Sequence, residues 1–177
     1  MGKPKLPLKV RGTPIIRLSV EALVPHVQDL VVVTGQDEAG VRAALDGLAI
    51  RFARNPRPHD GQGSSIAVGV AALQPGTRAT VIALGDQPRV PPAVVPALLA
   101  TWRRTGKAIV APAYRGLQGT PVIFAAEVFS ELRALAGDAG ARSVVLAQPQ
   151  RVELVGFDIP MPADVDTPED YARLHVQ

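Results

Sequence analysis

The sequence predicts an α/β fold built on a mostly parallel sheet. Apolar, strand-like runs alternate with segments of helical spacing, and strands joined by helices form parallel sheets with right-handed crossovers. The clearest run, residues 79–84, is apolar and partly β-branched, which favours a fully buried strand. The chain has 177 residues, no internal repeat and no long linker, so we expect one domain over residues 1–177.

The amino-acid composition argues against a disordered, nucleic-acid-binding or membrane-spanning protein. Hydrophobic residues make up 47% of the chain and charged residues 20%, which argues against disorder. The net charge is only +3, the arginines are scattered and aromatic residues are 4%, so nucleic acid is not an expected partner. No apolar run approaches the roughly 18 residues that span a bilayer. Cysteine is absent, which excludes disulfides and thiolate metal sites, and we expect a cytoplasmic protein without a membrane partner.

Proline, glycine and capping residues place the elements of the first half. Residues 1–13 are basic and broken by Pro4, Pro7 and Gly12, so they are expected to form a loop, after which Thr13 would cap the first helix. Ser64 or Ser65 would cap a later helix that follows a loop over 57–65. The expected helices lie at 15–23, 37–48 and 66–73, and the expected strands at 30–34 and 50–53.

The second half follows the same alternation. After the strand over 79–84, two prolines suit the first turn of a helix, and a glycine-rich break over 137–140 separates two further helices. The expected helices lie at 92–104, 127–135, 141–147 and 168–174. The expected strands lie at 108–112, 119–124 and 152–157.

Aspartates follow two of the expected strands. Asp86 stands at the carboxyl end of the 79–84 strand, the edge where open α/β sheets bind ligands. Asp164 and Asp166 follow the 152–157 strand, and they could converge with Asp86 on one Mg²⁺ beside a nucleotide's phosphates. The alternative is that these residues only cap turns and helices, with Asp166 or Thr167 at the start of the last helix.

Two further groups could bind an anionic ligand. Lys3, Lys5 and Arg11 lie in a proline-restricted loop and could neutralise a triphosphate, or they could form a solvated basic segment. Asn55 and the Asp-Gly-Gln-Gly-Ser-Ser segment at 60–65 could hold a base or phosphate, because glycine permits close backbone approach. An ordinary surface loop explains the second group equally well.

Six short segments occur in a fixed order along the chain: Met-Gly-Lys-Pro-Lys-Leu at 1–6, residues 61–69 with their adjacent serines, Gly-Asp-Gln-Pro at 85–88, Gly-Thr-Pro-Val-Ile-Phe at 119–124, Gly-Asp-Ala-Gly-Ala-Arg at 137–142, and residues 164–171. This order resembles the MobA-like nucleotidyltransferases, specifically their molybdenum-cofactor cytidylyltransferase branch. The resemblance covers essentially the full length. It implies a single-domain, three-layer α/β/α, Rossmann-like nucleotidyltransferase fold.

The resemblance also implies a reaction. CMP would pass from CTP to molybdopterin with release of pyrophosphate, Mg²⁺ would be the cofactor, and a molybdoenzyme is a candidate recipient. Such a transfer depends on positioning and charge neutralisation, because the attacking phosphate is already anionic. The resemblance implies Lys5 and Asp86 as catalytic residues and Asp86 with Asp166 as metal ligands. It implies nucleotide binding by Gly2, Lys5, Asn55, Ser64, Ser65 and Asp86, and acceptor binding by Gly119, Thr120, Pro121, Asp138 and Arg142.

The sequence departs from the family pattern at its start. Family members begin with an apolar strand and a Leu-Ala-Ala-Gly-x-Ser-x-Arg loop before the Met-Gly-x-Pro-Lys segment, and this sequence starts at that Met. We therefore expect a sheet that lacks one strand and has unpaired backbone edges. Two other functions remain open: a related transferase that uses GTP or another acceptor, and a non-catalytic nucleotide- or cofactor-binding chaperone for a molybdoenzyme.

Overall fold

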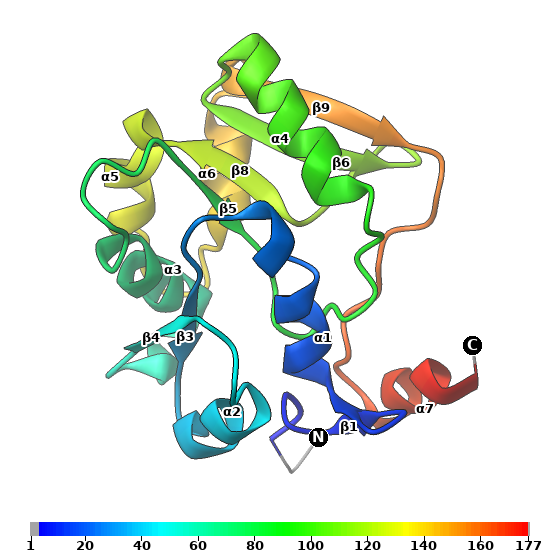
Figure 1. Cartoon of the computed structure of the whole chain (residues 1–177). Helices are drawn as coiled ribbons and strands as arrows, with labels where there is room; N and C mark the ends of the chain where they lie inside the picture. Colours follow the sequence, from blue (N-terminus) through cyan, green and yellow to red (C-terminus); the bar gives the residue numbers. More distant parts are fainter. Residues whose placement is uncertain (1–3, 177) are drawn as a thin grey trace.

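The computed structural model describes residues 4–176 and confirms an α/β architecture in layers (Figure 1). The strands are β1 (Lys9–Val10), β2 (Thr13–Pro14), β3 (Val31–Thr34), β4 (Arg51–Arg54), β5 (Ala79–Ile82), β6 (Ile109–Tyr114), β7 (Leu117–Gln118), β8 (Val122–Ala125) and β9 (Val152–Phe157). The α-helices are α1 (Ile15–Glu21), α2 (Glu38–Ala44), α3 (Gly61–Ala71), α4 (Val94–Thr105), α5 (Phe129–Arg133), α6 (Ala141–Ala147) and α7 (Pro168–Val176). Short 3-10 turns η1 (Val24–His26), η2 (Pro58–Asp60), η3 (Ala126–Val128) and η4 (Pro149–Arg151) connect them.

The main sheet is mixed, whereas the sequence predicted a mostly parallel one. Its order is β5-β8-β6-β7, with β9 parallel to β6 and β8 antiparallel to both β5 and β6. The reversal arises at Arg115 and Gly116, which both have positive φ and form a tight turn between β6 and β7. A short turn of this kind can only return the chain antiparallel.

Helices cover both faces of this sheet. On one face α4 buries Val94 and Leu98 against Val110 and Ile123 of the sheet. On the other face α5 and α6 pack in a second cluster around Phe124, with contributions from α3. Figure 1 shows α4 in front of the strands and α6 behind them. In residues 4–176 no helix is long and apolar enough to cross a membrane.

The strands β3 and β4 form a separate parallel pair. Within the described chain, β3 pairs only with β4 and β5 pairs only with β8. The expectation of a fully buried strand over 79–84 is wrong, because every residue of that segment is only partly buried. The reason is that β5 is an edge strand here, with one side of its backbone unpaired.

Two of the expected helix caps are also wrong. Thr13 lies in β2, and Pro14 occupies the N-cap position of α1 without a side-chain hydrogen bond. The helix α3 begins at Gly61, so Ser64 and Ser65 lie inside its first turns instead of before it. The expected loop over 57–65 is therefore shorter, because the turn η2 leads directly into α3. The segments 141–147 and 152–157 are confirmed at both ends as α6 and β9.

Candidate functional site

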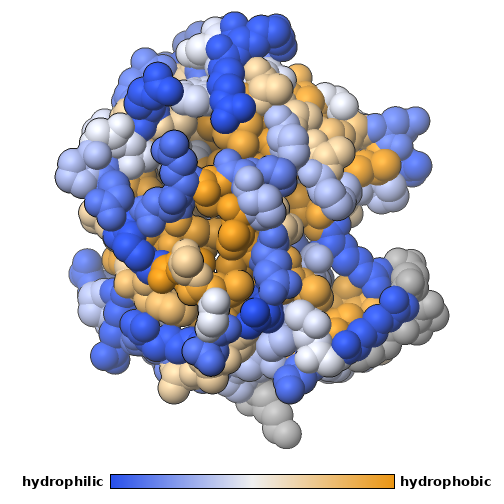
Figure 2. Space-filling model, viewed as in Figure 1, coloured by the Kyte–Doolittle hydropathy of each residue, from blue (hydrophilic) through white to orange (hydrophobic). Residues whose placement is uncertain are grey.

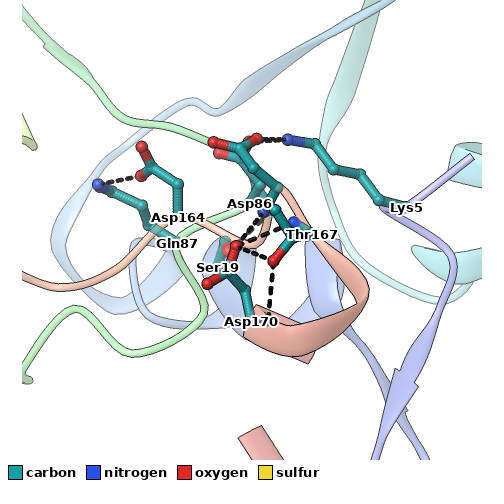
Figure 3. Close-up of polar contacts among 9 residues, drawn as sticks. Lys5, Ser19, Asp86, Gln87, Asp164, Thr167 and Asp170 are labelled. Carbon is teal, nitrogen blue, oxygen red and sulfur yellow. Dashed lines mark hydrogen bonds and ion pairs between the residues drawn. The ribbon is translucent and has the colours of Figure 1, made fainter. Parts of the chain in front are cut away.

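The Lys5 ammonium contacts two aspartates from distant parts of the chain. Figure 3 shows the Lys5 side chain reaching toward the Asp86 segment. Its Nζ is 2.5 Å from Oδ2 of Asp86, just beyond β5, and 2.6 Å from Oδ1 of Asp166, just before α7. The Asp86 side chain is 19% exposed and that of Asp166 is 64% exposed. The structure thus brings together three residues that the sequence proposed for triphosphate and metal binding.

Backbone hydrogen bonds hold this convergence in place. The Ser19 hydroxyl of α1 donates to the Gly85 carbonyl at 3.0 Å, which ties the end of the β5 segment to α1. The Val165 N–H donates to the Asp86 carbonyl at 3.1 Å, which brings Asp166 alongside. The position of the two carboxylates is therefore fixed by the main chain as well as by Lys5.

A capping box orients the segment that carries Asp166. The Asp170 carboxylate accepts hydrogen bonds from the Thr167 N–H at 2.9 Å and from the Thr167 hydroxyl at 2.8 Å, while the Asp170 N–H donates to that hydroxyl at 3.1 Å. The same carboxylate accepts the Asp166 N–H at 3.3 Å. Reciprocal bonds of this kind begin helices at Thr-x-x-acid sequences. The expectation that Thr167 caps the last helix is confirmed.

Burial, hydrogen bonds and neighbouring charges shift the pKa values of Lys5 and Asp164 in this cluster. Burial opposes the charge on Lys5, but hydrogen bonds to Asp166 and Asp86 outweigh it and raise the pKa of Lys5. Burial raises the pKa of Asp164, and the nearby negative charges of Asp86 and Asp166 add to this effect. Lys5 is therefore firmly cationic, and it balances carboxylates that would otherwise repel one another.

Gln87 is a residue whose role the sequence did not reveal. It is 4% exposed, and its amide N–H₂ donates to Oδ1 of Asp164 at 2.6 Å, while its carbonyl oxygen accepts from the Thr120 hydroxyl. The Thr120 carbonyl in turn accepts the Tyr114 hydroxyl at 2.9 Å, and burial raises the pKa of Tyr114 to about 12. Gln87 thereby joins the Asp86 segment to the segment containing Gly119 and Thr120.

A second polar cluster lies at the start of α3. Asn55 is 3% exposed, and its side-chain N–H₂ donates to the hydroxyls of Ser64 and Ser65 at 2.8 and 3.0 Å. Its own N–H donates to the Thr34 carbonyl at 2.8 Å, which places the cluster at the carboxyl ends of β3 and β4. The sequence grouped Asn55 with Ser64 and Ser65, and the structure places them in contact.

Some of the other predicted site residues lie around a cavity of about 1100 Å³. Ser65, Gly119, Thr120 and Arg142 all line it. Pro121 follows Thr120 through a cis peptide bond. Gly2 and Lys3 lie outside the described residues.

Asp138 lies against the start of α3 and does not line the cavity. Gly61 (φ +80°) packs so closely on Gly137 and Asp138 that a Cβ would overlap the Gly137 carbonyl. The Gly63 N–H donates to that same carbonyl at 3.0 Å. The 137–142 segment is thereby held beside the Asn55 cluster.

The two aspartates around Lys5 suit a divalent cation. Mg²⁺ is commonly bound by one or two carboxylates together with substrate phosphates and water. Between residues 4 and 176 no group of three or more His, Asp or Glu is arranged to enclose a metal alone, so phosphate oxygens would have to complete the coordination. The Lys5 ammonium already shows that a cation fits between Asp86 and Asp166.

A family model and a curated protein both match most of this chain. A family model described as MobA-like NTP transferase domain matches residues 1–152. The Bacillus subtilis (strain 168) protein named "Purine catabolism protein PucB" is 27% identical over 185 residues, covering 97% of this chain and 87% of that protein.

Solved structures resemble the whole fold. Rv0371C from Mycobacterium tuberculosis H37Rv, solved in complex with manganese, is 31% identical with a TM-score of 0.82, covering 98% of this chain and 92% of that one. A nucleotidyl transferase from Methanothermobacter, Mth528, is 24% identical with a TM-score of 0.78, covering 97% and 83%, and this likeness concerns the fold alone. The manganese complex indicates divalent-metal binding among proteins similar to this one.

Proposed function

We propose, starting from the finding that this chain belongs to the MobA-like NTP transferase family, that it transfers CMP from CTP to molybdopterin and releases pyrophosphate. Family and fold support a nucleotidyltransferase in general. The observation that carries the proposal is the placement of Lys5 between Asp86 and Asp166 at the carboxyl end of β5. Such a cluster provides both a cation site and a mobile positive charge, which a triphosphate reaction requires.

Each member of the cluster has a distinct part in the proposed reaction. Asp86 and Asp166 would hold Mg²⁺ or Mn²⁺, which supplies charge neutralisation at the phosphates. Lys5 would leave the aspartates when they hold the metal and would contact the triphosphate. An anionic oxygen of the acceptor phosphate then attacks the α-phosphorus, the bond to the bridging oxygen breaks, and pyrophosphate leaves with that electron pair. No proton need be removed from the acceptor, so the residues act by orientation and charge.

The flanking residues divide the proposed site into two sides. Asn55, Ser64 and Ser65, with Gly2 and Lys5 of the basic loop, would bind the nucleotide. Gly119, Thr120 and Pro121, together with Asp138 and Arg142, would bind the acceptor. One cavity is lined by Ser65 of the first group and by Gly119, Thr120 and Arg142 of the second, and this shared lining supports a site with two neighbouring sides.

The decisive experiment measures pyrophosphate release from CTP and Mg²⁺ with molybdopterin as acceptor. We expect Asp86→Asn to lower the rate about 100-fold or more, by the scale of losing one transition-state charge contact. Asp158→Asn is the matched control, because the Asp158 side chain is fully exposed and remote from Lys5, and it should leave the rate unchanged. Normal transfer by Asp86→Asn would overturn the metal role.

A second candidate is a related transferase with another nucleotide or acceptor. The similarity to PucB, a protein named for purine catabolism, supports this second candidate. Thermal stability with Mg²⁺ and either CTP or GTP separates the two, because a ligand at 100 times its Kd stabilises the native state by about 2.7 kcal/mol. Stabilisation by GTP but not by CTP would identify GTP as the nucleotide donor. Binding without pyrophosphate release from any nucleotide would favour a chaperone that delivers cofactor to a molybdoenzyme.

A further inference from the structure

Gln87 is buried beside Thr120, a residue on the wall of the large cavity. Thr120 lines the cavity, whereas Gln87 is 4% exposed and does not line it. Most of the other lining residues are apolar, and Figure 2 shows apolar surface at the centre of the face drawn there. In a largely apolar pocket the few polar groups determine how a ligand is oriented. The hydrogen-bonding capacity of the Thr120 hydroxyl therefore bears on what this side of the cavity binds.

The partners of the Gln87 side-chain amide fix which of its ends carries the N–H₂ group. One end lies 2.6 Å from Oδ1 of Asp164 and 3.4 Å from the Pro162 carbonyl oxygen. Figure 3 shows the contact between Gln87 and Asp164. A carbonyl oxygen can only accept a hydrogen bond, and a carboxylate is also an acceptor, so the N–H₂ group is at this end. The amide oxygen of Gln87 lies at the other end, beside Thr120.

This orientation determines the direction of the hydrogen bond between Thr120 and Gln87. The Gln87 amide oxygen can only accept, so the Thr120 hydroxyl donates its single hydrogen to it. Only lone pairs then remain on the Thr120 hydroxyl oxygen. If that hydrogen turned toward a ligand instead, the buried amide oxygen of Gln87 would lose this partner, and an unsatisfied buried acceptor is unfavourable. Toward a ligand, the Thr120 hydroxyl is therefore a hydrogen-bond acceptor and not a donor.

The backbone around Thr120 is held in place by two further hydrogen bonds. The Tyr114 hydroxyl donates to the Thr120 carbonyl at 2.9 Å, and the Gly119 N–H donates to the Pro112 carbonyl at 3.1 Å. The Tyr114 ring packs so closely on Gly119 that a Cβ at this glycine would lie 2.8 Å from the Cε2 atom of the ring. These contacts keep the Thr120 hydroxyl beside Gln87, so its role as an acceptor is a fixed property of the folded chain.

We propose that Gln87 is a positioning residue, and that through Thr120 it makes this side of the cavity select an N–H group of a nitrogen heterocycle. Anionic phosphate oxygens only accept hydrogen bonds, so the Thr120 hydroxyl does not bind a phosphate. This role rests on the proposed function, which places Thr120 on the acceptor side, and it adds which end of the acceptor lies there. The N–H edge of the pterin ring contacts Thr120, and the phosphate that attacks CTP lies away from it.

Two fluorescent pterins test the proposal by binding alone. The first probe is 6-methylpterin, and the second is its analogue with methyl groups in place of every N–H hydrogen, which cannot donate a hydrogen bond. The full chain is titrated into a dilute solution of each probe without nucleotide or metal, and the change in pterin fluorescence gives the Kd. We expect the wild type to bind 6-methylpterin at least about tenfold more tightly than the methylated analogue.

The ratio of the two Kd values distinguishes this positioning role from a purely structural one. Thr120→Val removes the hydroxyl, and Gln87→Met frees that hydroxyl to rotate and donate, so each variant should reduce the ratio to about threefold or less. General damage to the segment would weaken binding of both probes alike and leave the ratio unchanged. Gln148→Met is the matched control, because Gln148 is exposed just beyond the end of α6, and it should keep the wild-type ratio.

Three results would overturn the proposal: no saturable binding of 6-methylpterin, equal Kd values for the two probes in the wild type, or an unchanged ratio in either variant. If Gln87→Met does not fold, Thr120→Val decides alone. The measurement includes no step of the reaction, so the two failures can be told apart. Selection of 6-methylpterin by a chain that releases no pyrophosphate would overturn the proposed transfer alone. Transfer to molybdopterin by a chain that lacks this selection would overturn only the role of Gln87.

Discussion

Lys5 occupies the space between Asp86 and Asp166 in which the proposed function places a metal ion. Its ammonium and a divalent cation therefore compete for the same carboxylates. We expect Lys5→Met to bind Mn²⁺ about tenfold more tightly than the wild type in the absence of nucleotide, which corresponds to about 1.4 kcal/mol. The same variant should show much slower nucleotidyl transfer. Isothermal titration with Mn²⁺ measures the first effect and pyrophosphate release the second.

Lys107→Met is the control for this prediction. The Lys107 ammonium donates to the Gln150 carbonyl at 3.0 Å on an exposed surface, so its removal changes the net charge equally without touching the cluster. Equal Mn²⁺ affinity of Lys5→Met and wild type would contradict a shared cation site. A parallel gain in Lys107→Met would show an effect of net charge alone.

The ionisation of Asp170 makes the stability of the folded protein depend on pH. Hydrogen bonds from the Thr167 side chain, then from the Arg173 side chain, lower the pKa of Asp170 to about 2. Because the folded pKa lies below the ordinary value of 3.8, the stabilisation is complete above that value and is lost as the pH falls toward 2. The thermal midpoint of wild type should therefore exceed that of Asp170→Asn at pH 6, and the difference should shrink between about pH 4 and pH 2. A constant difference across that range would contradict this account.

At the scale of single residues the sequence predicted the charged residues of the cluster but not the hydrogen bonds of Gln87 beside them. Asp86 and Asp166 stood out because carboxylates following apolar strands collect at one edge of a sheet. Gln87 carried no such signal, since its partners Thr120 and Asp164 lie 33 and 77 residues away and only the folded chain brings them together. The pairing of Asn55 with Ser64 and Ser65 was foreseen as a group, although the serines act from within α3.

At the scale of elements, the start of α3 depends on close packing of backbone against backbone. Gly61→Ala would place a Cβ on the Gly137 carbonyl in addition to the strain of positive φ. Gly76→Ala is the matched control, because Gly76 has φ +81° and nothing within 4 Å of its Cβ position. We expect a loss of about 1–2 kcal/mol from positive φ in both, and at least about 1 kcal/mol more in Gly61→Ala. Chemical denaturation measures the two, and equal losses would mean that the contact with Gly137 contributes nothing.

The elements that were predicted well are those whose ends are marked locally. The segments 141–147 and 152–157 lie between glycine, proline and glutamine breaks, and both match the structure. The burial of β5 was predicted wrongly. An apolar run shows that a strand is suited to burial, but it does not show whether a neighbouring strand pairs with each of its edges. The start of α3 was missed because Gly61 and Gly63 resemble loop residues. Only the close approach of Gly61 to Gly137, and of Gly63 to the backbone of Ala136 and Ala139, shows why glycine is needed within this helix.

At the scale of the whole molecule, the division of the sheet predicts unequal stability. The strand β6 is buried at all six residues and has partners on both sides, whereas β3 has a partner on one side only among residues 4–176. Native-state hydrogen exchange should therefore give the amides of β6 the opening free energy of global unfolding, and Val32 and Thr34 of β3 a lower one. Alternate residues of β3 bond to β4, as the bonds from Arg51 N–H to the Leu30 carbonyl and from Asn55 N–H to the Thr34 carbonyl indicate, so the Val31 and Val33 amides should exchange fastest of the four in β3. Equal protection throughout would contradict a divided sheet.

The cluster of Lys5, Asp86 and Asp166 has a consequence for how the protein is made. Lys5 and Asp166 are 161 residues apart in the sequence, and Asp86 lies between them. A ribosome must therefore have added Asp166 before the three side chains can meet, and closing so long a chain segment carries an entropic cost that the packed fold must already offset. A nascent chain that stops short of this aspartate could have most of its sheet and still lack the proposed cation site.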